Sequence, residues 1–194
     1  MNSSKIFFIP EPPVSPKTGG EIYNKKVFEY LSNKYNIVGF SIENNKYINN
    51  NLCNALLNFI FAGYRNILYT IKFKNVKDNI IIEDGYYSFD LLLLNWLHSS
   101  HESTIIPIVH HLYYPLYKGK MSYVFKMIES IFLINSDFVI TNSEWTKRDI
   151  LVLNKRARIV VVNPGPNIAP IKKIYKKYDG NKITLLSVGS LTRR

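Results

Sequence analysis

The feature of this sequence that most restricts its fold is a regular alternation between short apolar runs and longer segments with helical periodicity. Runs rich in Ile, Val and Phe predict strands at residues 5–10, 36–42, 79–83, 103–110, 137–142 and 158–163. The segments between them repeat apolar residues at helical spacing, at residues 20–34, 52–73, 87–97, 119–135 and 144–153. This alternation is typical of parallel sheets whose strands are buried on both faces. The sequence therefore predicts an α/β fold, a Rossmann-like parallel sheet with helices on both faces.

A second domain is expected to begin near the end of the chain. With 194 residues, of which 46% are hydrophobic, the chain can bury one core, and we assign it to residues 1–165. Prolines and lysines predict a linker at residues 166–181, followed by a new strand within residues 182–194. Because one strand cannot form a domain, we expect a fragment of a longer protein or one half of a two-chain enzyme.

The charge of the chain favours anionic partners. Lys and Arg outnumber Asp and Glu by 25 to 14, which suits phosphorylated substrates, an anionic membrane or nucleic acid. No basic tail, zinc-ligand spacing or aromatic RNA-binding signature is present, so nucleic acid is not an expected partner. The single cysteine, Cys53, cannot form an internal disulfide, and no cleavable leader pattern follows the start, which favours the cytoplasm. Polar and basic residues interrupt residues 52–73, which predicts a soluble helix with one apolar face instead of a membrane span.

Two adjacent glycines stand at the start of the first predicted helix. The amides and the helix dipole at Gly19 and Gly20 favour an anion such as a phosphate, although a plain tight turn explains the same residues. The loop before them is proline-rich and does not carry the GxGxxG dinucleotide fingerprint.

Polar residues follow several predicted strands, where open α/β sheets bind their ligands. Glu83 and Asp84 end the third strand and can orient hydroxyl groups or act as a base, with helix capping as the alternative for Asp84. His110 and His111 end the fourth strand, point to opposite faces and are not expected to hold one metal ion, and both can be structural histidines. Ser143 is a good helix N-cap whose neighbouring amides can also meet a ligand.

Taken in order, these pieces resemble the GT-B glycosyltransferases of family 4. The resemblance rests on Pro16 to Gly20, the strand ending at His110, residues 137–144, Val162-Asn163-Pro164-Gly165, and Ser187 to Leu191, and it covers essentially the whole chain. It implies two Rossmann-like domains facing a cleft, of which the first binds mainly the acceptor and the second binds most of the nucleotide sugar. It also implies a retaining hexosyltransferase that uses a nucleotide-sugar donor, a glycan or lipid-phosphate acceptor, and no metal or other cofactor.

The resemblance also implies roles for individual residues. His110 is the expected catalytic residue, with Glu83 and Asp84 as neighbouring carboxylates. The expected substrate-binding residues are Gly19, Gly20, His111, Ser143, Ser190 and Arg194.

The chain departs from the family pattern at its end. Ser190 stands where the family often has Arg, and the family's diphosphate-binding lysine would fall beyond Arg194. The acidic element of the family's second domain is absent from this sequence. We therefore expect this chain alone to transfer sugar poorly.

Two other functional classes stay open. The chain can be a non-catalytic acceptor-binding subunit that needs a separate donor-binding chain. It can also be another nucleotide-binding Rossmann protein such as a dehydrogenase, for which Glu43 imitates the acidic ribose anchor but the glycine fingerprint is missing. The basic charge, together with Tyr113, Tyr114 and Tyr117, also predicts contact with an anionic membrane.

Overall fold

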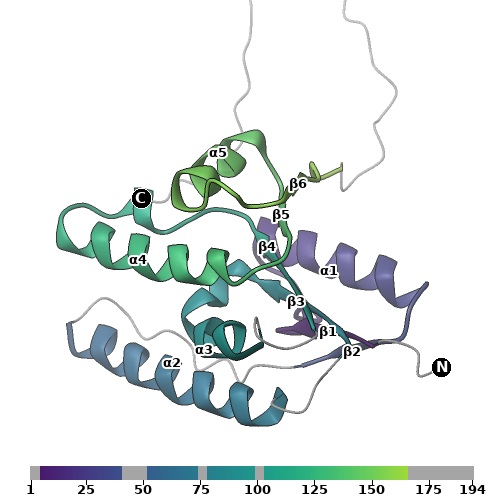
Figure 1. Cartoon of the computed structure of the whole chain (residues 1–194). Coiled ribbons are helices and arrows are strands. Elements are labelled where there is room, and N and C mark those ends of the chain that lie inside the picture. Colours follow the sequence, from purple (N-terminus) through teal and green to yellow (C-terminus); the bar gives the residue numbers. More distant parts are fainter. Residues whose placement is uncertain (1–4, 41–51, 74–77, 99–102, 166–194) are drawn as a thin grey trace, which may run out of the picture. The chain divides into compact units, whose positions relative to one another are not determined.

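The computed structural model describes residues 5–40, 52–73, 78–98 and 103–165 (Figure 1). For residues 52–60 and 98 it describes only the course of the backbone. The described part of the chain forms one compact unit that runs to Asn163. The predicted linker, the strand predicted after it, Ser190 and Arg194 lie outside the described residues.

A six-stranded parallel sheet lies at the centre of this unit. Its strands are β1 (Ile6–Ile9), β2 (Ile37–Gly39), β3 (Ile80–Asp84), β4 (Thr104–Val109), β5 (Val139–Thr141) and β6 (Ile159–Val161), in the order β2-β1-β3-β4-β5-β6. Every neighbouring pair is parallel, and β1 pairs with β2 on one side and with β3 on the other. The α/β fold and each predicted strand position are therefore confirmed, with β3 shifted by one residue and the other strands shorter than predicted.

The helices cover the two faces of the sheet unequally. They are α1 (Gly19–Ser32), α2 (Leu52–Phe73), α3 (Ser88–His98), α4 (Lys120–Ile134) and α5 (Glu144–Leu153), with short 3-10 turns η1 (Gly85–Tyr87) and η2 (Tyr114–Leu116). The helices α2, α3, α4 and α5 pack in that order on one face, whereas α1 lies on the other (Figure 1). Because side chains alternate along a strand, Phe8 and Ile82 pack towards α1, and Ile9 and Ile81 pack towards the other helices.

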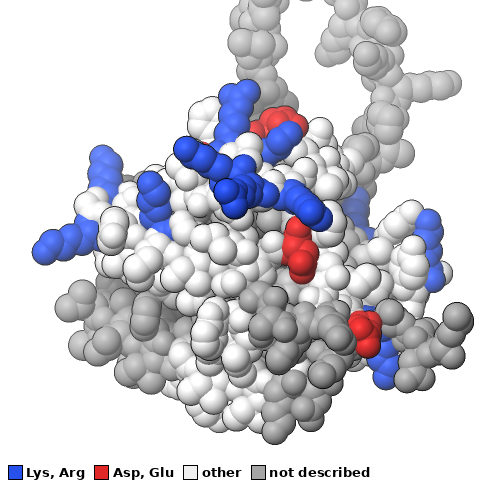
Figure 2. All heavy atoms as spheres, viewed as in Figure 1, with Lys and Arg blue, Asp and Glu red and all other residues white. Residues whose placement is uncertain are grey.

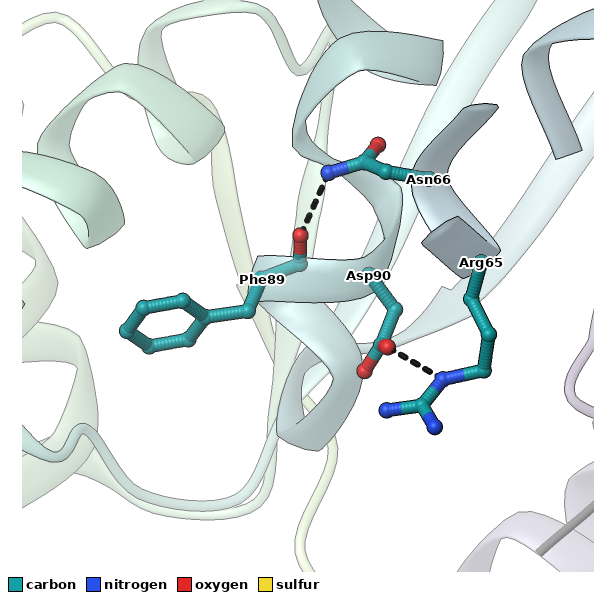
Figure 3. Close-up of polar contacts among 4 residues, drawn as sticks. All are labelled: Arg65, Asn66, Phe89 and Asp90. Carbon is teal, nitrogen blue, oxygen red and sulfur yellow. Dashed lines mark hydrogen bonds and ion pairs between the residues drawn. The ribbon is translucent and has the colours of Figure 1, made fainter. Parts of the chain in front are cut away.

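Polar side chains fix α2 against α3 within the larger helix layer (Figure 3). The Arg65 guanidinium of α2 donates from Nε to Asp90 Oδ1 of α3 over 2.5 Å, and the Asp90 side chain is 2% exposed. Asn66 donates to the carbonyl of Phe89 and accepts from the amide of Leu93. The two helices are thus joined by specific bonds as well as by apolar contact.

The strand order changes direction at β1. The chain leaves β1 for β2 on one side and then crosses back to β3 on the other. In open α/β sheets the ligand crevice lies outside the carboxyl ends of the strands at such a switch point. The loop after β1, the turn η1 and the loop after β4 all leave this edge of the sheet.

The predicted helix at residues 52–73 is confirmed as α2, with Phe61, Tyr64 and Leu68 on an exposed apolar face. Among the residues that the structure describes, no helix combines the length and the apolar character needed to cross a bilayer.

Candidate functional site

Helix α1 begins at the carboxyl edge with a capping box. The amide of Glu21 donates to Thr18 Oγ1, and the amides of Thr18 and Lys17 donate to Glu21 Oε2. Thr18 is therefore the N-cap, and Gly19 and Gly20 are the first two residues of the helix. Amides in the first turn of a helix have no partner within their own helix, which is why helix N-termini such as this one favour anions.

Gly20 allows α1 to approach the end of β4. A Cβ atom added to Gly20 would lie 3.1 Å from Cδ2 of His110, closer than side chains normally pack, whereas one added to Gly19 would meet nothing within 4 Å. The requirement for glycine at position 20 therefore comes from the His110 ring, and Gly19 faces open space.

The imidazole of His110 is held on both of its nitrogen atoms. Nε2 lies 3.0 Å from Oδ1 of Asn24, and Nδ1 lies 3.3 Å from Nδ2 of Asn142. The Tyr23 ring meets the imidazole edge to face, with centroids 5.2 Å apart. Asn24 uses its amide nitrogen for Asp84, so its oxygen must accept from His110, which assigns the proton of the ring to Nε2. Burial lowers the pKa of His110 to about 4, with a smaller contribution from His111, so the ring is neutral at neutral pH.

Asp84 continues this network towards β3. One oxygen accepts from Nδ2 of Asn24 at 2.9 Å, and the other accepts from the amide of Tyr86 at 2.9 Å, where Asp84 caps η1. Burial raises the pKa of Asp84 to about 6, although both hydrogen bonds act in the opposite direction. We call the chain Asp84, Asn24, His110 and Asn142 the edge network.

Glu83 does not join the edge network. It is fully buried on the face of the sheet covered by α3, where Nδ2 of Asn95 donates to it at 2.9 Å. Burial raises the pKa of Glu83 to about 8, against the weaker effect of the Asn95 hydrogen bond. The structure thus separates the two adjacent carboxylates onto opposite faces of the sheet.

Two further predicted site residues lie near the network. His111 is exposed beside the Tyr113 ring. Ser143 caps α5 by accepting from the amide of Thr146, and Thr146 Oγ1 donates to the carbonyl of His110. The cap therefore fixes the backbone of His110 through one intermediate residue.

Several residues of this edge were not singled out from the sequence. Asn24 interrupts the apolar stripe of α1, yet it is 3% exposed, and a buried amide needs partners. Asn142 directly follows β5, and Tyr23 donates from Oη to the carbonyl of Val162 at 3.0 Å. A polar residue inside an apolar stripe was the available signal for Asn24, whereas the partners of Tyr23 and Asn142 depend on the tertiary fold.

Glu129 of α4 organises the loop after β4. It is 2% exposed, and its two oxygens accept from the amides of Tyr113 at 2.6 Å and Tyr114 at 3.1 Å. Burial raises the pKa of Glu129 to about 7, although both backbone hydrogen bonds lower it. This loop follows His110 and His111 directly.

The chemistry available at this edge is that of a buried polar network, with a neutral imidazole and one carboxylate, beside first-turn amides. Such a site can bind hydroxyl groups and phosphate oxygens through fixed donors. Within the described ranges, no group of three or more His, Cys, Asp or Glu side chains is arranged to hold a metal ion. The sequence matches no protein-family model, and comparison with curated proteins also finds no match.

Proposed function

We propose that this chain is the amino-terminal, acceptor-side half of a retaining glycosyltransferase of the GT-B type that uses a nucleotide sugar as donor. The observation that supports this most is that residues from separate segments of the resemblance lie close together at the carboxyl edge of the sheet. Gly20 lies so near the ring of His110 that an added Cβ atom would be 3.1 Å from its Cδ2, Asn142 donates to the same ring, and the Val162 carbonyl accepts from Tyr23 in α1. These positions come from four of the five segments that carry the resemblance, and the fifth lies outside the described residues.

The proposal gives the edge network a positioning role. Both nitrogens of His110 are hydrogen-bonded and its pKa is about 4. In this proposal the neutral ring therefore forms a fixed surface beside the transferring sugar and does not transfer a proton. The amides of Gly19 and Gly20 approach the donor phosphates at the start of α1. Asp84 anchors the network, and Glu83, on the opposite face, has no contact with substrate in this proposal.

Donor binding by this chain alone is expected to be weak. The groups that stabilise charge on the departing diphosphate belong, in this proposal, to a second half supplied in cis or in trans. Each missing charge-assisted hydrogen bond to the diphosphate lowers the binding free energy of the donor by about 1.5 to 3 kcal/mol. Affinity for a sugar nucleotide should therefore be in the range of about 1 mM or weaker.

The proposal is tested by amide NMR of the chain titrated with UDP-glucose and GDP-mannose at millimolar concentration. We expect at least one donor to shift the amides of Gly19, Gly20 and Asn142 together. Gly20→Ala should abolish these shifts, because the added methyl group displaces His110. Gly63→Ala is the matched control, since a Cβ atom there meets nothing within 4 Å.

The outcomes separate the candidate functions. Shifts at Gly19 and Gly20 with a sugar nucleotide, but not with NAD, support the glycosyltransferase. Shifts with NAD alone would favour another Rossmann-type nucleotide-binding protein, and shifts with a sugar acceptor alone would favour a non-catalytic acceptor-binding subunit. No response at this edge to any of these ligands would contradict the proposed site.

A further inference from the structure

Helix α4 is apolar on its outer face as well as on its inner face. Ile128, Phe132 and Leu133 are buried in the inner side of the helix. On the opposite side, Tyr123 is 72%, Met127 50%, Ile131 38% and Ile134 63% exposed. The spacing of these four places them on one stripe of the helix. A surface helix normally presents polar residues on this side, so an apolar stripe indicates a partner.

The loop before α4 packs against the other side of the helix, at its amino-terminal end, through an aromatic cluster. Leu116 and Tyr117 are exposed, and the ring of Tyr117 stacks on Phe125 with centroids 4.5 Å apart. Phe125 also stacks on Tyr113, so the exposed tyrosine is supported by a packed aromatic pair. We call the exposed stripe on the opposite side, Tyr123, Met127, Ile131 and Ile134, the α4 face.

The exposed charged residues of α4 and of the loop before it are all lysines. Lys118, Lys120 and Lys126 are exposed, whereas Glu129, the acidic residue of α4, is buried and bonded to backbone amides. Figure 2 shows lysine and arginine side chains gathered over α4 and α5. A partner that covers this face must therefore combine an apolar surface with negative charge.

We propose that the α4 face rests on the surface of an anionic bilayer, with α4 lying in the plane of the interface. Apolar and aromatic residues on one side of a helix, flanked by lysines, are the features that bind headgroup regions containing anionic lipids. The inference goes beyond the proposed function and does not depend on which reaction the edge network supports.

The same charges argue against a second copy of the chain as the occupant. A symmetric contact places the same patch of both copies together, so Lys118, Lys120 and Lys126 would face one another without a nearby exposed carboxylate from α4. Anionic headgroups neutralise these lysines, whereas a second copy adds to their repulsion.

The position of α4 also relates the bilayer to the edge network. In this sheet α4 begins where the loop after β4 ends, so Tyr117 and Lys120 lie at the carboxyl edge that also holds His110. A bilayer under the α4 face would thus lie beside the candidate site. An amphiphilic ligand could reach that site without leaving the interface.

The test is sedimentation of the whole chain with vesicles at low salt. One set contains phosphatidylcholine alone, and the other contains phosphatidylcholine with one third phosphatidylglycerol. We expect recovery with the anionic vesicles only. Lys120→Glu combined with Lys126→Glu should weaken binding at least about tenfold, and Lys26→Glu combined with Lys34→Glu, which makes the same charge change at α1 on the other face of the sheet, should weaken it much less.

A second pair of variants tests the apolar part of the α4 face. Met127→Glu combined with Ile131→Glu should abolish recovery, whereas Trp145→Glu combined with Val152→Glu, at exposed positions on α5, should leave most of it. Circular dichroism confirms that each variant is folded. Equal recovery with both vesicle types, or equal losses for the α4 and α5 variants, would overturn the proposal. A dimer that forms without lipid and is lost in the α4 variants would overturn it in favour of a second copy.

Discussion

The side-chain amide of Asn24 decides which nitrogen of the His110 imidazole carries the proton. It gives its nitrogen to Asp84 and therefore offers only its oxygen to His110, which places the ring proton on Nε2, while burial keeps the ring neutral. An aspartate at position 24 would instead place a carboxylate 3.0 Å from Nε2, and an opposite charge at this range favours the protonated ring.

We therefore predict that Asn24→Asp raises the pKa of His110 from about 4 by about one unit or more. The pH dependence of the imidazole nitrogen shifts measures this directly. Asn33→Asp adds the same charge at the exposed end of α1 and should leave the His110 titration in place. An unchanged titration in Asn24→Asp would mean that the amide does not set the state of the ring.

The buried pair of Glu83 and Asn95 leaves two oxygens without a hydrogen-bond partner, Oε1 of Glu83 and Oδ1 of Asn95. A proton on Glu83 turns one of its carboxyl oxygens into a donor and removes the cost of a buried negative charge. This agrees with the pKa of about 8 that burial gives Glu83.

The pH dependence of stability follows from this shift. The folded pKa of Glu83 is about 8 against an ordinary value of 4.5, so the folded state holds the proton more tightly. The stabilisation is present below pH 4.5 and is lost as pH rises towards 8. We predict that wild type loses about 1 kcal/mol of unfolding free energy per pH unit between pH 6 and 8 relative to Glu83→Gln. Urea unfolding at several pH values tests this, and parallel curves for the two proteins would contradict it.

At the scale of elements, the bond between Arg65 and Asp90 is the main charged link between α2 and α3. Burial raises the pKa of Asp90 more strongly than Arg65 lowers it, so the carboxylate depends on its partner. Arg65→Met leaves a buried charge without compensation and should cost about 3 to 5 kcal/mol of unfolding free energy at pH 7.

The double variant Arg65→Met with Asp90→Leu should recover most of this loss, because it removes both charges together. Lys147→Met breaks an exposed ion pair with Glu144 and should cost less than about 1 kcal/mol. Urea unfolding measures all three variants. A cost for Arg65→Met as small as that for Lys147→Met would show that the link contributes little.

Elements of this fold could be predicted from sequence more completely than the site. The predicted helices at 52–73 and 144–153 have the observed bounds, because their apolar spacing and the cap at Ser143 are local signals. The faces of adjacent strand residues also followed from alternation. That rule separates Glu83 from Asp84, although the sequence alone did not indicate which of the two faces α1. Asn142 and Glu129 gain their roles only from partners distant in sequence, so local patterns gave no signal for them.

For the molecule as a whole, the order of the strands matters more than the length of any one of them. The edge network joins side chains from α1, from the end of β3, and from just after β4 and β5. It can therefore form only once all of these elements are in place in the sheet. The site is therefore a property of the complete sheet, and no single βαβ unit contains it.

The central position of β1 also has a consequence during synthesis. Its residues leave the ribosome before those of both neighbouring strands, and Ile6 pairs with both Ile37 and Ile80, so one edge of β1 stays unpaired until β3 has been translated. Until then a nascent chain carries an apolar strand with an unpaired edge, which is the kind of surface that chaperones cover and that aggregates when they do not. Translation pauses before Asp84 should therefore lower the yield of folded protein more than pauses after Thr141.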